Sequence, residues 1–212
     1  MNRRLGKQFG SLISVLSILT SILTACTSNS ANNSIQIVSA KKLVAFAPVA
    51  ATLGQDWYQN QPTSTFALAR SQQVKVKLCD NEYFMSFVGP DGVEARFANN
   101  SSSSQLSLGI FSANSKLSEA EVWNALQKCF LKSASGYSSP LVLHSINPLG
   151  VSGSENGSWY VESGTHNMPY LVLGVIYVVQ VGYVVGLYSY FGHDNLGKVL
   201  TILKRAAGIL KN

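Results

Sequence analysis

The stretch PYLVLGVIYVVQVGYVVGLYSYF, from Pro169 to Phe191, decides how this chain folds. Its 23 residues carry no charge and could cross a bilayer as one helix. They also include seven valines and five tyrosines, residue types that favour pleated strands. A helix would place Tyr177, Gln180 and Tyr183 at the middle of the membrane, where their polar groups are costly. We therefore predict two buried strands, apolar on both faces, with a break near residues 180–182.

One alternative for this stretch stays open at the level of sequence. Gly174, Gly182 and Gly186 would share one face of a helix, and such small residues let membrane helices pack closely. Four basic residues follow before the C-terminus, as the positive-inside preference requires. In that case the protein would be an inner-membrane protein with a transmembrane helix at 169–191.

Upstream of this stretch the residue pattern indicates more strands. Residues 74–78 alternate apolar with charged side chains, which is typical of a strand with one wet face. Tyr83–Val88 and Val93–Phe97 flank Gly89-Pro90-Asp91-Gly92, a sequence typical of a hairpin turn. Ser101–Ser104 is predicted to be a solvated loop, followed by a strand from Leu106 to Phe111.

Two helices are indicated in the second half of the chain. At the first, Ser118 and Glu121 have the spacing of a capping box, and the helix should run to about Ser133. Its predicted buried stripe is Val122, Leu126, Cys129 and Phe130. The second helix should cover Asn195 to Leu210, with Asp194 as its N-terminal cap.

Strand patterns also occur at Leu141–Ile146 and Trp159–Glu162, separated by the glycine-rich sequence GVSGSENG, which we predict to be a loop. Strands, a helix, more strands and a final helix predict an α+β fold, a largely antiparallel sheet covered by helices. We place this single domain at residues 35–212. Its order of elements resembles small envelope lipoproteins with a PsbP-like fold, a likeness that extends only to element order and the leader described next.

The first 25 residues have the layout of a secretory signal peptide. Positive charges at Arg3, Arg4 and Lys7 precede an uncharged apolar stretch and small residues. The sequence Leu23-Thr24-Ala25-Cys26 resembles the lipobox of bacterial lipoproteins, in which the cysteine is lipidated and becomes the mature N-terminus. The resemblance implies that palmitate-type acyl chains on Cys26 anchor the protein to a membrane. Residues 27–34 contain no large apolar side chain and should form a flexible tether.

The leader also indicates where the protein works. Thr27 is not the aspartate that the resemblance to inner-membrane lipoproteins would require. We therefore favour the outer membrane, with the domain facing the periplasm, over the inner membrane. Without the leader the chain has 13 basic and 10 acidic residues and no dense basic cluster, so we expect no nucleic-acid partner. An envelope protein is the partner that this location implies.

Residues that could carry chemistry are few. Cys79 and Cys129 could form a disulfide after export, or remain two separate thiols. His144, His166 and His193 are scattered, so we expect no metal site and no cofactor. The sequence shows no catalytic constellation, which favours a non-catalytic binding or accessory module in the envelope. A periplasmic hydrolase that uses His144 or His166 with a carboxylate stays open as a further alternative.

Two aromatic pairs could serve either binding or packing. Trp57-Tyr58 and Trp159-Tyr160 are of a type that anchors protein interfaces. The interpretation that we favour places each pair in the core, with its polar tip at the surface.

Overall fold

The apolar stretch forms two adjacent strands, β8 (Val172–Val181) and β9 (Val184–Gly192), joined by a turn at Gly182 and Tyr183. The structure is a computed structural model that describes residues 37–69, 75–78, 81–134, 142–151, 153–162 and 172–211. Both strands are buried on both faces along most of their length. The prediction of two strands with a break near residue 181 is confirmed, and the helical alternative is wrong for these residues. Within the described ranges, no helix combines the length and the apolar character that a membrane crossing requires.

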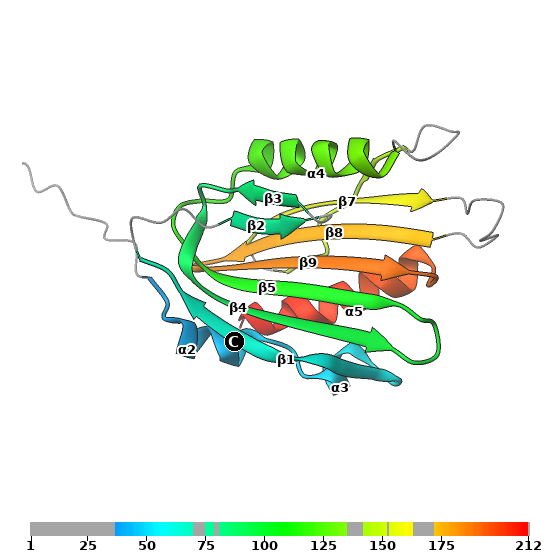
Figure 1. Cartoon of the computed structure of the whole chain (residues 1–212), viewed down its shortest axis with the longest axis horizontal. Coiled ribbons are helices and arrows are strands. Elements are labelled where there is room, and N and C mark those ends of the chain that lie inside the picture. The colour runs from blue at the N-terminus through cyan, green and yellow to red at the C-terminus, as the bar shows by residue number, and fades with distance from the viewer. Residues whose placement is uncertain are drawn as a thin grey trace, which may run out of the picture. The chain divides into compact units, whose positions relative to one another are not determined.

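The two strands lie inside a seven-stranded sheet in which every neighbouring pair is antiparallel (Figure 1). In spatial order the strands are β1 (Trp57–Ala67), β4 (Val88–Asn99), β5 (Gln105–Ala113), β9, β8, β7 (Ser154–Glu162) and β6 (His144–Ser145). A separate two-stranded hairpin consists of β2 (Lys75–Leu78) and β3 (Asn81–Phe84). The predicted α+β fold with a largely antiparallel sheet is therefore confirmed.

Helices cover both faces of the sheet. The helical elements are α2 (Ala40–Leu43), η1 (Val44–Phe46), α3 (Ala50–Leu53), α4 (Glu119–Ala134), α5 (Leu196–Gly208) and η2 (Ile209–Lys211). The short helices and α5 pack on one face, while α4 and the β2–β3 hairpin pack on the other. Figure 1 shows α5 behind the strands and the hairpin in front of them. We call these faces the α5 side and the α4 side.

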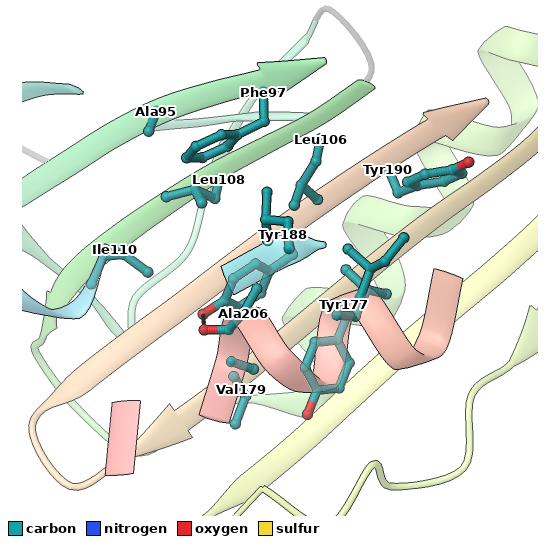
Figure 2. Close-up of a cluster of buried hydrophobic side chains, with 14 of the residues drawn as sticks. Ala95, Phe97, Leu106, Leu108, Ile110, Tyr177, Val179, Tyr188, Tyr190 and Ala206 are labelled. Atoms are coloured by element: carbon teal, nitrogen blue, oxygen red, sulfur yellow. Dashed lines mark hydrogen bonds between the residues drawn. The ribbon is translucent and has the colours of Figure 1, made fainter. Parts of the chain in front are cut away.

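The core on the α5 side is rich in aromatic rings (Figure 2). Tyr177, Tyr188 and Tyr190 extend from β8 and β9 on this side and are at most 1% exposed. Apolar residues at helical spacing in α5 cover them, as the sequence predicts. The Tyr188 hydroxyl lies 3.5 Å from the carbonyl oxygen of Ala206. The tyrosines of this stretch thus supply apolar area to the core, and the hydroxyls of Tyr188 and Tyr190 also lie close to polar partners.

The predicted hairpin at residues 89–92 is wrong, because these four residues lie inside β4. The ladder between β4 and β5 shifts register between Val88 and Gly92, so Pro90 needs no backbone N–H for it. Position 89 requires glycine because Ser112 of β5 lies close to its backbone, and a Cβ there would lie 2.3 Å from Ser112 Oγ. The two glycines and the proline thus mark a bulge rather than a turn.

The start of α4 and the bounds of β6 and β7 also differ in part from the prediction. Ser118 does cap α4, since its hydroxyl accepts from the backbone N–H of Glu121 at 3.3 Å. The Glu121 carboxylate does not complete the capping box, because it accepts from the backbone N–H and the hydroxyl of Ser86, each at 2.7 Å. The glycine-rich segment is partly strand, since β7 already begins at Ser154. In the region of the predicted strand Leu141–Ile146, only β6 forms.

Candidate functional site

A pocket of about 530 Å³ opens on the α4 side of the sheet. It lies over β4, β5, β7, β8 and β9, and Val76 of β2 also lines it. We call it the sheet-face pocket. Its polar lining consists of Glu94, Arg96, Gln105, Ser107 and Ser189.

Strand register brings these polar groups together from distant parts of the chain. Arg96 pairs with Ser107, and Ser107 pairs with Ser189 on the next strand. Side chains of directly paired residues point to the same face, so these three form one row across the sheet. Gln105 and Phe191 belong to the neighbouring row. Their alternating neighbours point into the core on the α5 side.

Aromatic rings lie on glycines beside this polar row. A Cβ on Gly174 would lie 2.3 Å from the Cζ atom of Tyr160, and one on Gly109 would lie 2.5 Å from Phe111. Each ring therefore occupies the space of the missing side chain. Phe191 in the same pocket is 48% exposed. The pocket thus combines ring faces for stacking with hydroxyl, amide and charged groups for hydrogen bonds.

The two charges of the pocket are available to a ligand. Glu94 and Arg96 are both exposed and lie on the same face of β4. Among the described residues, the ion pairs are Lys75 with Glu82 at 3.3 Å and Lys198 with Asp194 at 2.6 Å. Neither pair includes a pocket residue. A bound molecule could therefore be met by one cation and one anion side by side.

A second polar group lies at one end of the sheet, where the β4–β5 turn meets the start of α5. We call it the Asp194 cluster; its members are Ser102, Ser104, Tyr190, Asp194 and Lys198. Asp194 Oδ2 accepts from both serine hydroxyls at 3.1 Å and lies 2.9 Å from the Tyr190 hydroxyl. Asp194 Oδ1 accepts from Lys198 Nζ at 2.6 Å. The carboxylate thereby ties the turn to the helix.

The lowered pKa of Asp194 indicates that its hydrogen-bond partners favour the charged carboxylate in the folded chain. Burial alone would raise the pKa of Asp194, but hydrogen bonds from Lys198, Tyr190 and Ser102 outweigh it and lower that pKa. Burial raises the pKa of Tyr190 to about 12. An acid with a lowered pKa is a weak base for activating the serine hydroxyls.

The Asp194 cluster also corrects one sequence prediction. Asp194 does not cap α5, since the cap is Asn195, whose side chain accepts from the backbone N–H of Lys198 at 2.9 Å. The predicted loop at residues 101–104 is a turn, but Ser104 is fully buried in it and bonded to the cluster. Both differences arise because the Asp194 carboxylate accepts hydrogen bonds from the β4–β5 turn and from Lys198 of α5.

Most of the predicted site residues lie outside the ranges that the structure describes. Cys26, Cys79 and His166 are outside the described residues, and Cys129 belongs to α4. Lipidation of Cys26 and a disulfide between Cys79 and Cys129 therefore remain predictions. Within the described part of the chain, no three His, Cys, Asp or Glu residues gather as a metal site.

The histidines and aromatic pairs are placed as follows. The imidazole of the exposed His144 stacks on the indole of Trp159, with ring centroids 4.3 Å apart. Trp57 is buried, whereas its neighbour Tyr58 is 45% exposed. Trp159 and Tyr160 are both half-buried on opposite faces of β7. The favoured interpretation of core packing is confirmed for Trp57.

Sequence reasoning missed the sheet-face pocket. Its residues occupy alternate positions of strands, a pattern that also describes any solvated sheet face. Only the order of strands, which places β9 beside β5, brings Ser189 and Phe191 next to Ser107 and Gln105. Comparison with protein-family models, with curated proteins and with solved structures finds no match for this chain.

Proposed function

We propose that this protein is a membrane-anchored envelope lipoprotein that acts as a non-catalytic binding or accessory module. Its acyl anchor is Cys26, and its domain faces the periplasm, with the outer membrane favoured. A ligand or an envelope protein partner binds in the sheet-face pocket. The observation that carries the binding part is the row of polar side chains and ring faces in that pocket.

The chemistry of the pocket favours binding over turnover. Its lining residues offer a guanidinium, a carboxylate, an amide and hydroxyls, together with aromatic rings. These groups recognise a polar ligand by hydrogen bonds and stacking. The hydrolase alternative would use His144 or His166, of which His144 is stacked on Trp159 and His166 lies outside the described residues.

A photo-crosslinking experiment in intact cells tests the binding site. A photoreactive amino acid replaces Ser107, which lies in the middle of the polar row and is half-buried. We expect a discrete adduct that is lost when Arg96→Ala is added to the same chain. The matched control carries the photoreactive group at Thr201, an exposed residue of α5 on the other side of the sheet. An identical adduct from both positions, or one indifferent to Arg96→Ala, would contradict this site.

The anchor has its own test. We expect mass spectrometry of the mature N-terminus from a wild-type host to find Cys26 carrying acyl chains. Membrane fractionation should then place the protein with the outer membrane. An unmodified Cys26 within an intact precursor would rule out the lipoprotein assignment. An enzymatic turnover lost on substitution of one histidine or carboxylate would overturn the non-catalytic role.

A further inference from the structure

The helical elements of the α5 side carry charge of only one sign. Their cations are Lys41, Lys42, Lys198, Lys204, Arg205 and Lys211, and none of these elements contains an acidic residue. The closest acids in the chain are Asp56 after α3 and Asp194 before α5. Asp194 is already paired with Lys198. On the same side of the sheet, the Glu155 carboxylate of β7 accepts a hydrogen bond from the backbone N–H of Leu149. The helices of this layer themselves therefore present only cations to solvent.

Four of these cations form no ion pair with the described residues. Lys41, Lys42, Lys204 and Arg205 are exposed, and none belongs to the ion pairs that the described residues form. By contrast, Lys211 Nζ donates to the carbonyl oxygen of Gly150 at 3.2 Å. We call the four exposed residues the basic face.

The α4 side has a different character. Its exposed or half-buried side chains carry both signs, with Glu82, Glu119 and Glu121 beside Lys75, Lys116 and Lys128. Mixed charge gives little net attraction to an anionic surface. The helices of the α5 side thus carry only positive charge, whereas the α4 side of the same protein carries charges of both signs.

Apolar side chains accompany the cations. Val44 follows Lys42 after one residue and is 42% exposed, while Val49 is 66% exposed. Cations next to exposed aliphatic side chains are typical of surfaces that rest on lipid headgroups and insert shallowly below them.

An acyl anchor at Cys26 would bring this surface close to a bilayer, and here the inference rests on the proposed function. Cys26 precedes the first residue of α2, Ala40, by 14 positions. A flexible chain of that length spans about 20 Å on average. An acylated Cys26 would hold Lys41 and Lys42 within reach of the headgroups, where each basic residue strengthens binding to anionic lipids about fivefold.

We propose that the basic face docks on anionic phospholipid headgroups of the membrane that holds the anchor. Docking through the α5 side sets the orientation of the domain. The sheet-face pocket lies on the opposite face of the sheet, so it looks away from the bilayer and stays open to a periplasmic partner.

Vesicle binding tests this inference separately from the anchor. Residues 35–212 form a compact unit of their own, so a chain of residues 27–212 is used without acyl groups. We expect it to bind vesicles of phosphatidylcholine with about one third phosphatidylglycerol, to bind pure phosphatidylcholine at least tenfold more weakly, and to be released by salt. Equal binding to both kinds of vesicle, or binding to neither, would overturn the proposal.

Paired variants locate the surface. Lys41→Gln with Lys42→Gln, and Lys204→Gln with Arg205→Gln, should each weaken binding to anionic vesicles about tenfold or more. The matched control, Lys116→Gln with Lys128→Gln, removes the same charge from the α4 side and should change binding less than about twofold. Equal losses from all three pairs would refute a specific face.

The two proposals fail in different ways. If Cys26 is unmodified but the vesicle results hold, the anchor is wrong and the docking surface stands. If Cys26 is acylated but residues 27–212 show no preference for anionic vesicles, the docking surface is wrong and the anchor stands.

Discussion

Asp194 shows how much of this fold depends on one side chain. Only 7% of its side chain is exposed, and it accepts hydrogen bonds from two serines and a lysine while contacting a buried tyrosine hydroxyl. These contacts join the β4–β5 turn, β9 and α5. Hydrogen bonds to a charged group stabilise more than those between neutral groups.

Asp194→Asn tests this role, because the change keeps the shape and removes the charge. The amide group would face hydroxyl groups that now donate to a carboxylate, so we expect a loss of about 2–3 kcal/mol in the free energy of unfolding. Urea denaturation measures the loss. In the control Lys198→Met only a half-exposed partner is removed, which should cost about 1 kcal/mol or less. A loss no larger in Asp194→Asn than in Lys198→Met would refute the central role of the carboxylate.

The pH dependence of stability follows from the lowered pKa of Asp194. A carboxyl whose pKa is lower in the folded chain stabilises the fold above its unfolded value, about 3.9, and loses this contribution as the pH falls through its folded value. The stability difference between the wild type and Asp194→Asn should therefore be constant between about pH 5 and pH 7 and shrink below about pH 4. Urea titrations at several pH values measure it, and a difference that persists unchanged at about pH 3 would contradict this origin.

The start of β7 requires glycine for two reasons. Gly153 has a φ of +130°, and a Cβ there would lie 1.9 Å from the carbonyl oxygen of Gln180 in β8. Gly150, three residues earlier, has a φ of +75° but has no atom within 4 Å of an added Cβ. Substitution of Gly150 therefore tests backbone strain alone, whereas substitution of Gly153 tests backbone strain together with a steric collision.

Gly153→Ala should destabilise the protein more than Gly150→Ala. Strain at positive φ costs about 1–2 kcal/mol at either position. At residue 153 the collision with β8 backbone adds to it, for a total of about 3 kcal/mol or more. Thermal or urea denaturation compares the two variants. Equal losses would show that β7 and β8 separate easily at this end.

The strands of this sheet show which features of the fold can be predicted from sequence. Valine and tyrosine content identified β8 and β9 because both faces of these strands are covered, so their composition reports burial directly. Gly89 and Pro90 were misread as a turn because glycine at a close approach has the same local sequence as glycine at a turn. Ser107 and Ser189 could not be joined from sequence, since their pairing depends on strand order. Local composition therefore predicts elements, whereas the site arises from their arrangement.

For the whole molecule, burial predicts an order of local stability. The strands β5, β8 and β9 are covered on both faces along most of their length, whereas most of β1 is exposed. In hydrogen exchange on residues 27–212, we expect paired backbone amides of β8 and β9 to exchange most slowly, and those of the exposed edge strands β1 and β6 to exchange fastest within the sheet. Slower exchange in β1 than in β9 would contradict this distribution of the core.

The pairing of β5 with β9 has a consequence for how the chain acquires its structure. Ser112 pairs with Val184 and Gln105 with Phe191, so this ladder joins segments more than 70 positions apart. The other ladders join β1, β4 and β5 into one group and β6 to β9 into another. During synthesis from the N-terminus, the edge of β5 that later pairs with β9 stays unpaired until β9, which lies within the last 30 residues of the chain, has been made. Until then that apolar edge is open to other chains, so the newly made protein needs shielding from aggregation before its sheet is complete.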